Sequence, residues 1–295
     1  MSIKIVTDST CDLPPQVVSD LGITVVPCYL NFGEDSYLDG IDLSKKQFYS
    51  RLRTDVNHPT TSAPNLNMFI NVYKKLIAEG AKEIISIHVP ESFSSIINIA
   101  KQAAKTFKCT KISVFDSGQL SLGTGFMVMA AARSAAICKT SEEIIKYLIH
   151  MVKNTYTFAI LDTLDYLKKS GRLSQFKCKM GTLLDIKPMI TLHMGEIKLD
   201  IVRTNIKALK KLIGQVKRLG YVEKIAVLHL DAPERALALS RQLGEIISKN
   251  IDYFFEEATP VLGVHLGPGA VGAICVRAEE KLTIGRMNEN RNCNR

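Results

Sequence analysis

Hydroxyl side chains gather at three places where a strand-like apolar run gives way to a helix-like pattern. These places are Asp8-Ser9-Thr10, Thr61-Ser62, and the group Ser92, Ser94 and Ser95. A helix N-terminus exposes unpaired N–H groups and the positive end of the helix dipole, so a hydroxyl there can help to hold an anion. The alternative interpretation is that each hydroxyl only caps its own helix. Several such turns along one sheet favour a shared anion site.

A histidine, His265, ends the apolar run that begins at Val261, and the turn Gly267-Pro268-Gly269 follows it closely. Two glycines around a proline let the backbone turn sharply and approach a ligand. We expect a strand on each side of this turn, so that His265 is held in a fixed place. A single histidine beside a turn is more often structural. Its interpretation as a ligand-binding residue therefore depends on the hydroxyl-bearing turns.

Common signatures of nucleotide, metal and nucleophilic chemistry are absent from the sequence. None of its 18 glycines is followed by lysine, so it contains no Walker A motif. Its six histidines form neither H-E-x-x-H nor H-x-H, and its seven cysteines form no C-x-x-C pair. The nucleophile elbow G-x-S-x-G is missing. The sequence alone does not exclude a Ser/His/Asp triad built from distant residues. We expect no metal and no cofactor.

The elements that must position these side chains alternate between strand and helix patterns in the first half of the chain. Strands are expected over 3–7, 23–30, 83–89 and 111–115. Helices are expected over 12–22, 61–80 and 92–107, with a long helix after the turn at 116–125. Capping boxes are expected at Ser44 with Gln47 and at Thr140 with Glu143. This order is typical of a parallel sheet with helices on both faces, which binds ligands at the carboxyl ends of its strands.

The pattern changes near residue 155, where hairpins begin to mix with helices. Segments 186–192 and 196–202 predict a hairpin, and the bond before Pro188 predicts that the first of them is an edge strand. An α+β domain with a mostly antiparallel sheet is expected here. The predicted division is an N-terminal parallel α/β domain over 1–155, a C-terminal domain over 156–280 and a disordered basic tail over 281–295.

The net charge of +9 and the scattered cysteines limit the class of protein. An odd number of cysteines, several of them in apolar runs, is typical of a reduced cytoplasmic protein, and the first residues predict a strand rather than a signal peptide. The basic residues form no stripe with interleaved aromatic residues, so we expect no nucleic-acid partner. Arg203 lies in a basic segment after the predicted hairpin, which makes it a candidate for partner docking.

Six motifs in this order resemble the DegV family of fatty-acid-binding proteins, over the chain from Ile3 to about Arg277. The motifs are Asp8-Ser9-Thr10-Cys11-Asp12-Leu13-Pro14, Thr61-Ser62-Ala63-Pro64, Asp116-Ser117 with Ser121-Leu122-Gly123, Tyr166-Leu167-Lys168-Lys169 with Gly171-Arg172, Ile186-Lys187-Pro188, and His265 with Gly267-Pro268-Gly269-Ala270. Any one motif alone is a weak signal. Together they are specific.

The resemblance implies a two-domain α/β protein that binds one long-chain fatty acid in a tunnel between the domains. It implies a set of carboxylate-binding residues, which are Thr61, Ser62, Ser94 and His265. It also implies a supporting polar network of Arg172, Gly267 and Gly269. Proteins of this kind are not kinases themselves. They present the carboxylate to a separate ATP-dependent fatty acid kinase, which forms an acyl phosphate for phospholipid metabolism, and transient membrane contact is expected.

The sequence departs from the family pattern near the expected site. Where the family usually has Leu-Ser-Gly-Thr, this chain has Phe93-Ser94-Ser95-Ile96, and Ala63 and Ser170 replace a usual glutamine and glycine. Two rival functions follow from the residues. One is a hydrolase or transferase of a small anionic substrate, with His265 as base and Ser94 or Ser9 as nucleophile. The other is a regulatory module that senses acyl chains.

Overall fold

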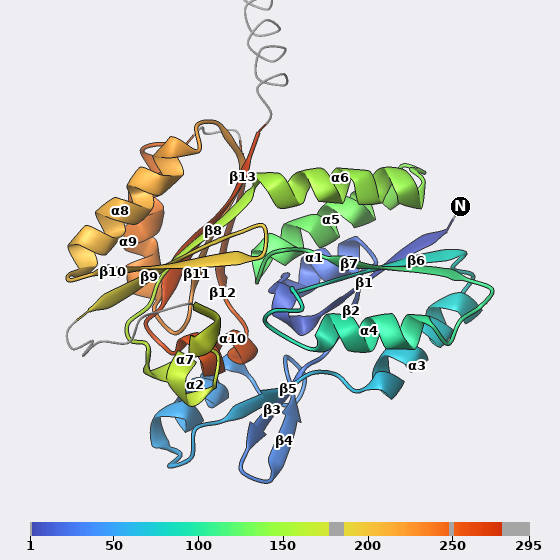
Figure 1. The fold of residues 1–295 in the computed structure, drawn as a ribbon, viewed down its shortest axis with the longest axis horizontal. Helices are drawn as coiled ribbons and strands as arrows, with labels where there is room; N and C mark the ends of the chain where they lie inside the picture. The colour runs from blue at the N-terminus through green and yellow to red at the C-terminus, as the bar shows by residue number, and fades with distance from the viewer. Residues whose placement is uncertain (1, 177–185, 248–250, 279–295) are drawn as a thin grey trace, which may run out of the picture.

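The computed structural model describes residues 2–176, 186–247 and 251–278 (Figure 1). The tail expected over 281–295 lies outside these residues. The described chain forms three β-sheets with helices packed around them. No helix within this described part is long and apolar enough to cross a membrane.

The first sheet is parallel, as the sequence predicts, and its four strands lie in the order β2-β1-β6-β7. Buried isoleucine and valine fill its central strands because helices cover both faces, with α3 and α4 on one side and α5 and α6 on the other (Figure 1). The strands are β1 (Ile3–Asp8), β2 (Thr24–Val26), β6 (Glu83–His88) and β7 (Lys111–Asp116). The helices are η1 (Ser9–Cys11), α1 (Pro15–Asp20), α3 (Leu66–Ala78), α4 (Ile96–Ala104), α5 (Leu122–Ala136) and α6 (Ser141–Asn154).

Both predicted capping boxes are confirmed. Ser44 and Gln47 exchange side-chain and backbone hydrogen bonds at the start of α2 (Lys45–Thr54). Thr140 and Glu143 do the same at the start of α6. Each pair supplies partners for N–H groups that a helix start leaves unsatisfied.

A small antiparallel sheet, in the order β4-β3-β5, replaces part of the predicted pattern. The strand expected over 23–30 is interrupted after Val26, and Thr61 lies in strand β5 rather than at a helix start. Helix α3 begins only after Asn65, whose side chain accepts a hydrogen bond from the N–H of Met68. The residue before Pro64 is disfavoured in the helical region, so the chain stays extended there. The strands are β3 (Tyr29–Phe32), β4 (Asp35–Leu38) and β5 (Thr60–Ser62).

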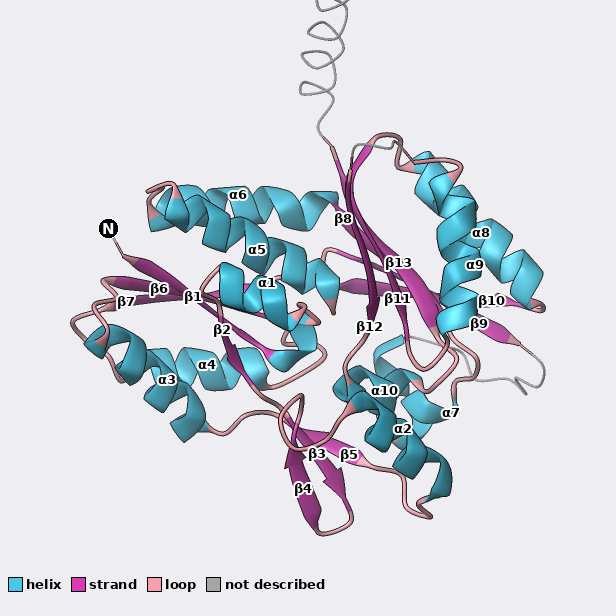
Figure 2. Ribbon diagram, turned by 180° about the vertical axis from the view of Figure 1, so that it is seen from behind, coloured by secondary structure: helices cyan, strands magenta, loops and turns pink. Residues whose placement is uncertain are grey.

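The third sheet is mostly antiparallel and has six strands in the order β10-β9-β8-β13-β11-β12. Figure 2 shows α8 and α9 against one of its faces. The predicted hairpin is confirmed as β9 and β10. The strands are β8 (Thr155–Ile160), β9 (Lys187–His193), β10 (Glu196–Val202), β11 (Val222–His229), β12 (Asp252–Glu257) and β13 (Val271–Arg277). The helices are α7 (Asp165–Lys169), η2 (Leu173–Phe176), α8 (Asn205–Arg218), α9 (Pro233–Gly244) and α10 (Pro260–Leu266).

The prediction that Pro188 marks an edge strand is wrong. Strand β9 pairs with β10 on one side and with β8 on the other. Pro188 is tolerated because it is the second residue of the strand, and the ladder with β8 begins only at Met189.

The prediction of a strand ending at His265 is also wrong, because Pro260–Leu266 is the helix α10. Pro260 at the first helical position and Gly267 with φ of +77° just after the last turn are strong helix boundary signals. These two boundary signals outweigh the strand preference of the β-branched residues between them. Only β13, after the glycine turn, is a strand as expected, so His265 lies in the last turn of a helix.

The first and third sheets share one apolar cluster, so the predicted domain division at residue 155 stays a prediction. Phe126 and Met127 of α5 belong to the same buried cluster as Leu228 and Ile274 of the six-stranded sheet. Twelve of the fifteen residues of α5 are buried, because this helix packs against strands of both sheets. Its methionines therefore fill the core between the sheets.

A buried carboxylate, that of Asp12, reinforces this junction. It accepts a hydrogen bond from the Ser121 hydroxyl at the start of α5 and another, at 2.8 Å, from the backbone N–H of Thr259 at the start of α10. Burial raises the pKa of Asp12 to about 6, although both hydrogen bonds oppose that rise. One side chain thus joins three segments that are far apart in the sequence.

Candidate functional site

A cavity of about 350 Å³ lies between the parallel sheet, the small sheet and α10. Its volume falls within the range of roughly 300–1,000 Å³ that is usual for small-molecule pockets. Five of the predicted site residues line it, which are Thr61, Ser62, Ser94, Arg172 and His265. Four elements that are distant in the sequence therefore bring these side chains to one place, which are β5, the start of α4, the end of α7 and the end of α10. Their role in binding stays a prediction.

His265 and Thr61 form the polar centre of the cavity. The Nε2 atom of His265 lies 2.9 Å from the Thr61 hydroxyl oxygen. Its Nδ1 atom is buried and has no hydrogen-bond partner within the described residues. Burial lowers the pKa of His265 to about 4, and the charge of Arg172 adds to this effect, so the imidazole is neutral at neutral pH. An unpartnered buried nitrogen is unusual in a folded protein.

Ser94 lies just before α4, which starts at Ile96 rather than at Ser92 as expected. Its hydroxyl oxygen accepts a long hydrogen bond of 3.4 Å from the N–H of Ile96, while Ser95 at the cap position makes no side-chain cap. The loop before the helix and its first residue line the cavity. The start of α4 therefore offers a hydroxyl and the positive end of a helix dipole to the cavity.

Arg172 follows α7 and is half-buried. Its Nη1 donates to the carbonyl of Ser170 at 2.8 Å, and within the described chain it makes no hydrogen bond to Thr61, Ser94 or His265. The guanidinium thus lines the cavity without joining the histidine–threonine pair directly.

Three predicted residues do not line this cavity. Gly267 packs against the ring of Tyr166, and Gly269 accepts a hydrogen bond from Arg235 through its carbonyl. Arg203 is exposed in the turn between β10 and α8. The two glycines therefore shape the end of α10, whereas Arg203 lies on a different surface.

An apolar extension adjoins the cavity, and the sequence analysis named a tunnel but none of the residues that line this extension. A second space of about 80 Å³ shares four lining residues with the first, which are Leu120, Ile197, Leu262 and Leu266. Small residues of the six-stranded sheet and of the segments on either side of α10 help to line it, which are Ala159, Gly272, Ala258 and Ala270. The polar centre at His265 therefore continues into a space lined mainly by apolar residues.

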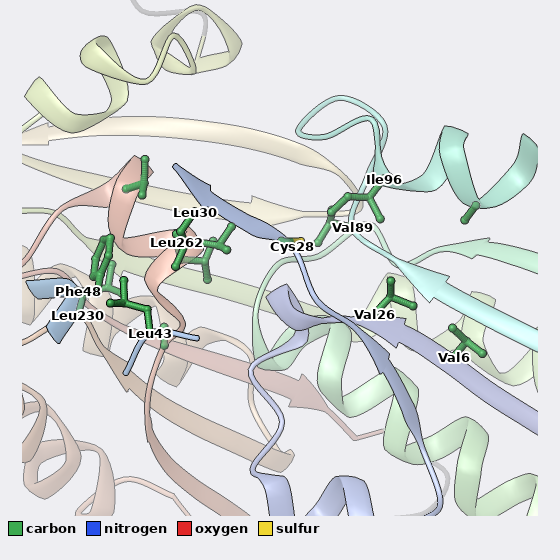
Figure 3. Close-up of a cluster of buried hydrophobic side chains, with 14 of the residues drawn as sticks. Val6, Val26, Cys28, Leu30, Leu43, Phe48, Val89, Ile96, Leu230 and Leu262 are labelled. Atoms are coloured by element: carbon green, nitrogen blue, oxygen red, sulfur yellow. The ribbon is translucent and has the colours of Figure 1, made fainter. Parts of the chain in front are cut away.

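The apolar walls of the cavity belong to a larger buried cluster. Figure 3 shows this cluster running from Val6 and Val26 of the parallel sheet past Cys28 and Val89 to Leu262 of α10. Cys28, Val89 and Leu262 line the cavity itself. In the sequence these apolar residues give no hint of a pocket, because a packed core uses the same residue types.

A Ser/His/Asp array exists, but it is buried outside the cavity. His88 bonds to the Asp8 carboxylate through Nδ1 and to the Ser86 hydroxyl through Nε2, both at 2.7 Å, and Tyr73 donates to Ser86. All four side chains are fully buried, so no substrate reaches the Ser86 hydroxyl. This array links β1, β6 and α3 and stabilises the parallel sheet.

The cavity itself gives no support to the hydrolase alternative. His265 pairs with Thr61 instead of a serine, and no described carboxylate orients its Nδ1 atom. Ser9, the other candidate nucleophile, accepts a hydrogen bond from the N–H of Cys28 and does not line the cavity. A serine activated by an oriented base is the minimum for this chemistry.

Comparison with known proteins finds one family along almost the whole chain. The model of the DegV family, described as uncharacterised proteins, matches residues 2–278. A DegV domain-containing protein of Streptomyces coelicolor is 33% identical over 276 residues, which make up 92% of this chain and 97% of that protein. The similarity is therefore not confined to a local motif.

Two solved structures are similar to the fold described above. A DegV family protein from Thermus thermophilus, described as binding fatty acid, has a TM-score of 0.87 at 27% identity and covers 94% of this chain and 100% of its own. DegV from Bacillus subtilis, described as a fatty acid binding protein, has a TM-score of 0.86 at 28% identity and covers 94% of this chain and 99% of its own. The expected α/β fold is therefore confirmed.

We predict that Gly267→Ala destabilises the protein strongly. A Cβ atom at Gly267 would lie 2.2 Å from Cδ2 of Tyr166, and φ is +77°. Backbone strain and overpacking together cost roughly 2–5 kcal/mol in the free energy of unfolding, measured by urea denaturation. Gly171→Ala is the matched control, because its φ is +71° but the space around it is open. Equal losses in the two variants would contradict a packing role for Gly267.

Proposed function

The chain belongs to the DegV family, and we propose that it binds one long-chain fatty acid, with the carboxylate among Thr61, Ser62, Ser94 and His265. The alkyl tail extends from there into the adjoining apolar space. The observation that carries this proposal is a cavity with the hydrogen-bonded pair His265 and Thr61 on its wall, which continues between apolar side chains. The fatty acid binding described for the Thermus and Bacillus proteins supports it.

The energetics of such a ligand match this division into a polar and an apolar part. Burying about fourteen methylene groups at roughly 0.8 kcal/mol each contributes on the order of 11 kcal/mol before the costs of ordering. A carboxylate needs hydrogen-bond partners when it leaves water. Such partners are present in the lining of the cavity. They are the hydroxyl groups of Thr61 and Ser94 and the imidazole of His265.

We propose in addition that the protein presents the bound carboxylate to a separate ATP-dependent fatty acid kinase. Phosphoryl transfer needs residues that cradle a nucleotide and its Mg²⁺, and the sequence has no Walker A motif to supply them. The exposed Arg203 is the proposed contact for that partner. This role places the protein in the cytoplasm, with transient contact to the membrane from which its ligand comes.

We predict that Thr61→Val, Ser94→Ala and His265→Ala each lower retention of the fatty acid. A hydrogen bond to a charged group contributes about 1.5–3 kcal/mol, so each loss weakens binding roughly ten- to a hundredfold. Protein purified from cells is extracted with organic solvent, and the bound lipid is quantified by mass spectrometry. Ser36→Ala is the control, because this hydroxyl lies in the same small sheet but bonds only to Asn31. Wild-type retention by both Ser94→Ala and His265→Ala would refute the site.

We predict that a bound fatty acid raises the pKa of His265 from the value of about 4 in the free protein. A carboxylate next to the imidazole favours its protonated form. The complex then holds more protons than its separated parts, so affinity rises as the pH falls from about 7 to 5. ¹⁵N NMR of histidine-labelled protein with and without palmitate measures this pKa, and His265→Gln assigns the signal. An unchanged pKa in the complex would contradict the carboxylate position.

We predict that Arg203→Ala slows phosphorylation of the bound fatty acid by a fatty acid kinase without releasing the ligand. Arg203 is exposed and does not line the cavity, so its loss affects only docking. The control is Arg218→Ala, an exposed arginine at the far end of α8. Equal rates for Arg203→Ala and wild type would remove this residue from the docking surface. Ligand-dependent association with a protein other than a kinase would instead favour the regulatory module.

A further inference from the structure

The carboxyl group of Asp39 is buried without a hydrogen-bond partner. Asp39 directly follows strand β4 and is 2% exposed, and both of its carboxyl oxygens lack a partner among the described residues. Ser9 lies close enough to favour the ionised form but not to complete a hydrogen bond. A buried carboxylate without partners is costly, so folded proteins normally pair such a group or give it a ligand. The protein neighbours of Asp39 do not supply such a partner.

Two buried hydroxyl groups also lack partners among the described residues, which are those of Tyr49 and Thr259. Tyr49 is only 3% exposed, and Thr259 precedes α10 at the cap position without making a side-chain cap. With the two oxygens of Asp39, these make up four of the six unpartnered buried side-chain atoms in the described part of the chain. All four are oxygen atoms with free lone pairs, so a cation satisfies all of them at once.

Backbone hydrogen bonds hold Asp39 next to the loop that contains Asp12. The N–H of Asp39 donates to the carbonyl of Cys28 at 2.9 Å, and the N–H of Cys28 donates to the Ser9 hydroxyl oxygen at 3.1 Å. Ser9 and Asp12 lie at the two ends of the short helix η1. The turn after β4 is therefore adjacent to this loop, and the charge of Asp12 acts on the Asp39 carboxyl group.

Tyr49 and Thr259 reach the same region from α2 and α10, which pack against each other (Figure 2). A Cβ atom added at Gly263 would lie 3.0 Å from the Tyr49 hydroxyl oxygen. Gly263 is four residues after Thr259 and therefore lies on the same side of the helix. Thr259 in turn donates its backbone N–H to the Asp12 carboxylate. Both unpartnered hydroxyl groups thus lie along one side of α10, next to Asp12.

The charges in this region do not balance. Asp12 and Asp39 are both buried, and the cation whose charge favours ionisation of both is Lys45. The Lys45 Nζ atom donates to the carbonyl of Glu257 and forms no ion pair with either aspartate within the described residues. Asp8 adds further negative charge near Asp39. When both Asp12 and Asp39 are ionised, at least one negative charge is left without compensation.

We propose that Asp39, Tyr49 and Thr259 bind one monovalent alkali cation, Na⁺ or K⁺, beside Asp12. Carboxylate and hydroxyl oxygens are the ligands that hard cations take. One positive charge offsets the uncompensated negative charge. The described residues contain no group of three or more His, Cys, Asp and Glu side chains that could hold a metal ion, which argues against a divalent ion. The cation joins the turn after β4, helix α2 and the start of α10, so it stabilises the helix that carries His265.

The test measures the thermal stability of the wild-type protein in three chloride salts at equal concentration and alkaline pH. The salts are those of Na⁺, K⁺ and tetramethylammonium, an ion too large for a buried site. Binding to the folded state raises the melting temperature by roughly 2–4 °C for each tenfold rise in cation concentration above the dissociation constant. The larger of the Na⁺ and K⁺ shifts identifies the ion. Equal melting temperatures in all three salts overturn the inference.

Asp39→Asn keeps the shape of the side chain and removes its charge, and it is expected to abolish the difference between the salts. The matched control is Asp42→Asn, because Asp42 lies three residues later in the same turn but is exposed. Its side chain accepts a hydrogen bond from the N–H of Leu38, which an amide oxygen can also accept. The control is expected to keep the difference. A difference that persists undiminished in Asp39→Asn also overturns the inference.

A second measurement does not depend on any variant folding. Burial raises the pKa of Asp39 to about 7, so a cation that binds the ionised form must displace a proton from part of the molecules at neutral pH. Addition of NaCl or KCl to unbuffered wild-type protein at this pH is expected to release protons, measured with a pH-stat against tetramethylammonium chloride. Release no greater than that of the control shows that Asp39 is satisfied by a proton or by water, and the inference is then wrong.

Discussion

An anionic head group can lie inside an apolar interior only where its hydrogen-bond partners are in place before it arrives. Under the proposed function that requirement falls on α10 in this chain, because His265 lies in its last turn. The helix has only seven residues and is held at both ends. The Asp12 carboxylate bonds to Thr259 at its start, and Gly267 packs against Tyr166 at its end. The position of the imidazole, and with it the polar end of the cavity, depends on these two contacts.

The parts of the fold that the sequence predicts well are those that local patterns determine. The parallel sheet follows from apolar runs separated by helix signals, and the capping box at Thr140 and Glu143 depends on residues three apart. The helix of His265 was missed because Val261 and Val264 are typical of strands, although Pro260 and Gly267 mark helix ends. Where local signals conflict in a short segment, packing against neighbours decides, and the sequence does not display those neighbours.

In the candidate site, too, local motifs were predicted and long-range packing was not. Motif resemblance singles out Thr61, Ser94 and His265, and the structure places all three on one cavity. The residues that line the apolar extension were not predicted, because Ala159 and Gly272 look like ordinary strand residues until β8 and β13 pair. The hydrogen bonds of the Asp12 carboxylate were not predicted either, because its partners are more than a hundred residues away in the sequence. Properties that arise from long-range pairing leave no periodic signal in a single sequence.

The apolar cluster around α5 has a thermodynamic consequence for the whole chain. Phe126 of this helix shares a core with Leu228 and Ile274 of the six-stranded sheet. Neither sheet can therefore unfold without exposing apolar side chains that pack against the other. We therefore expect heating to disrupt both halves in one cooperative transition, with equal calorimetric and van't Hoff enthalpies. Isolated halves, cut near Thr155, would each leave half of this core in water and would not fold alone.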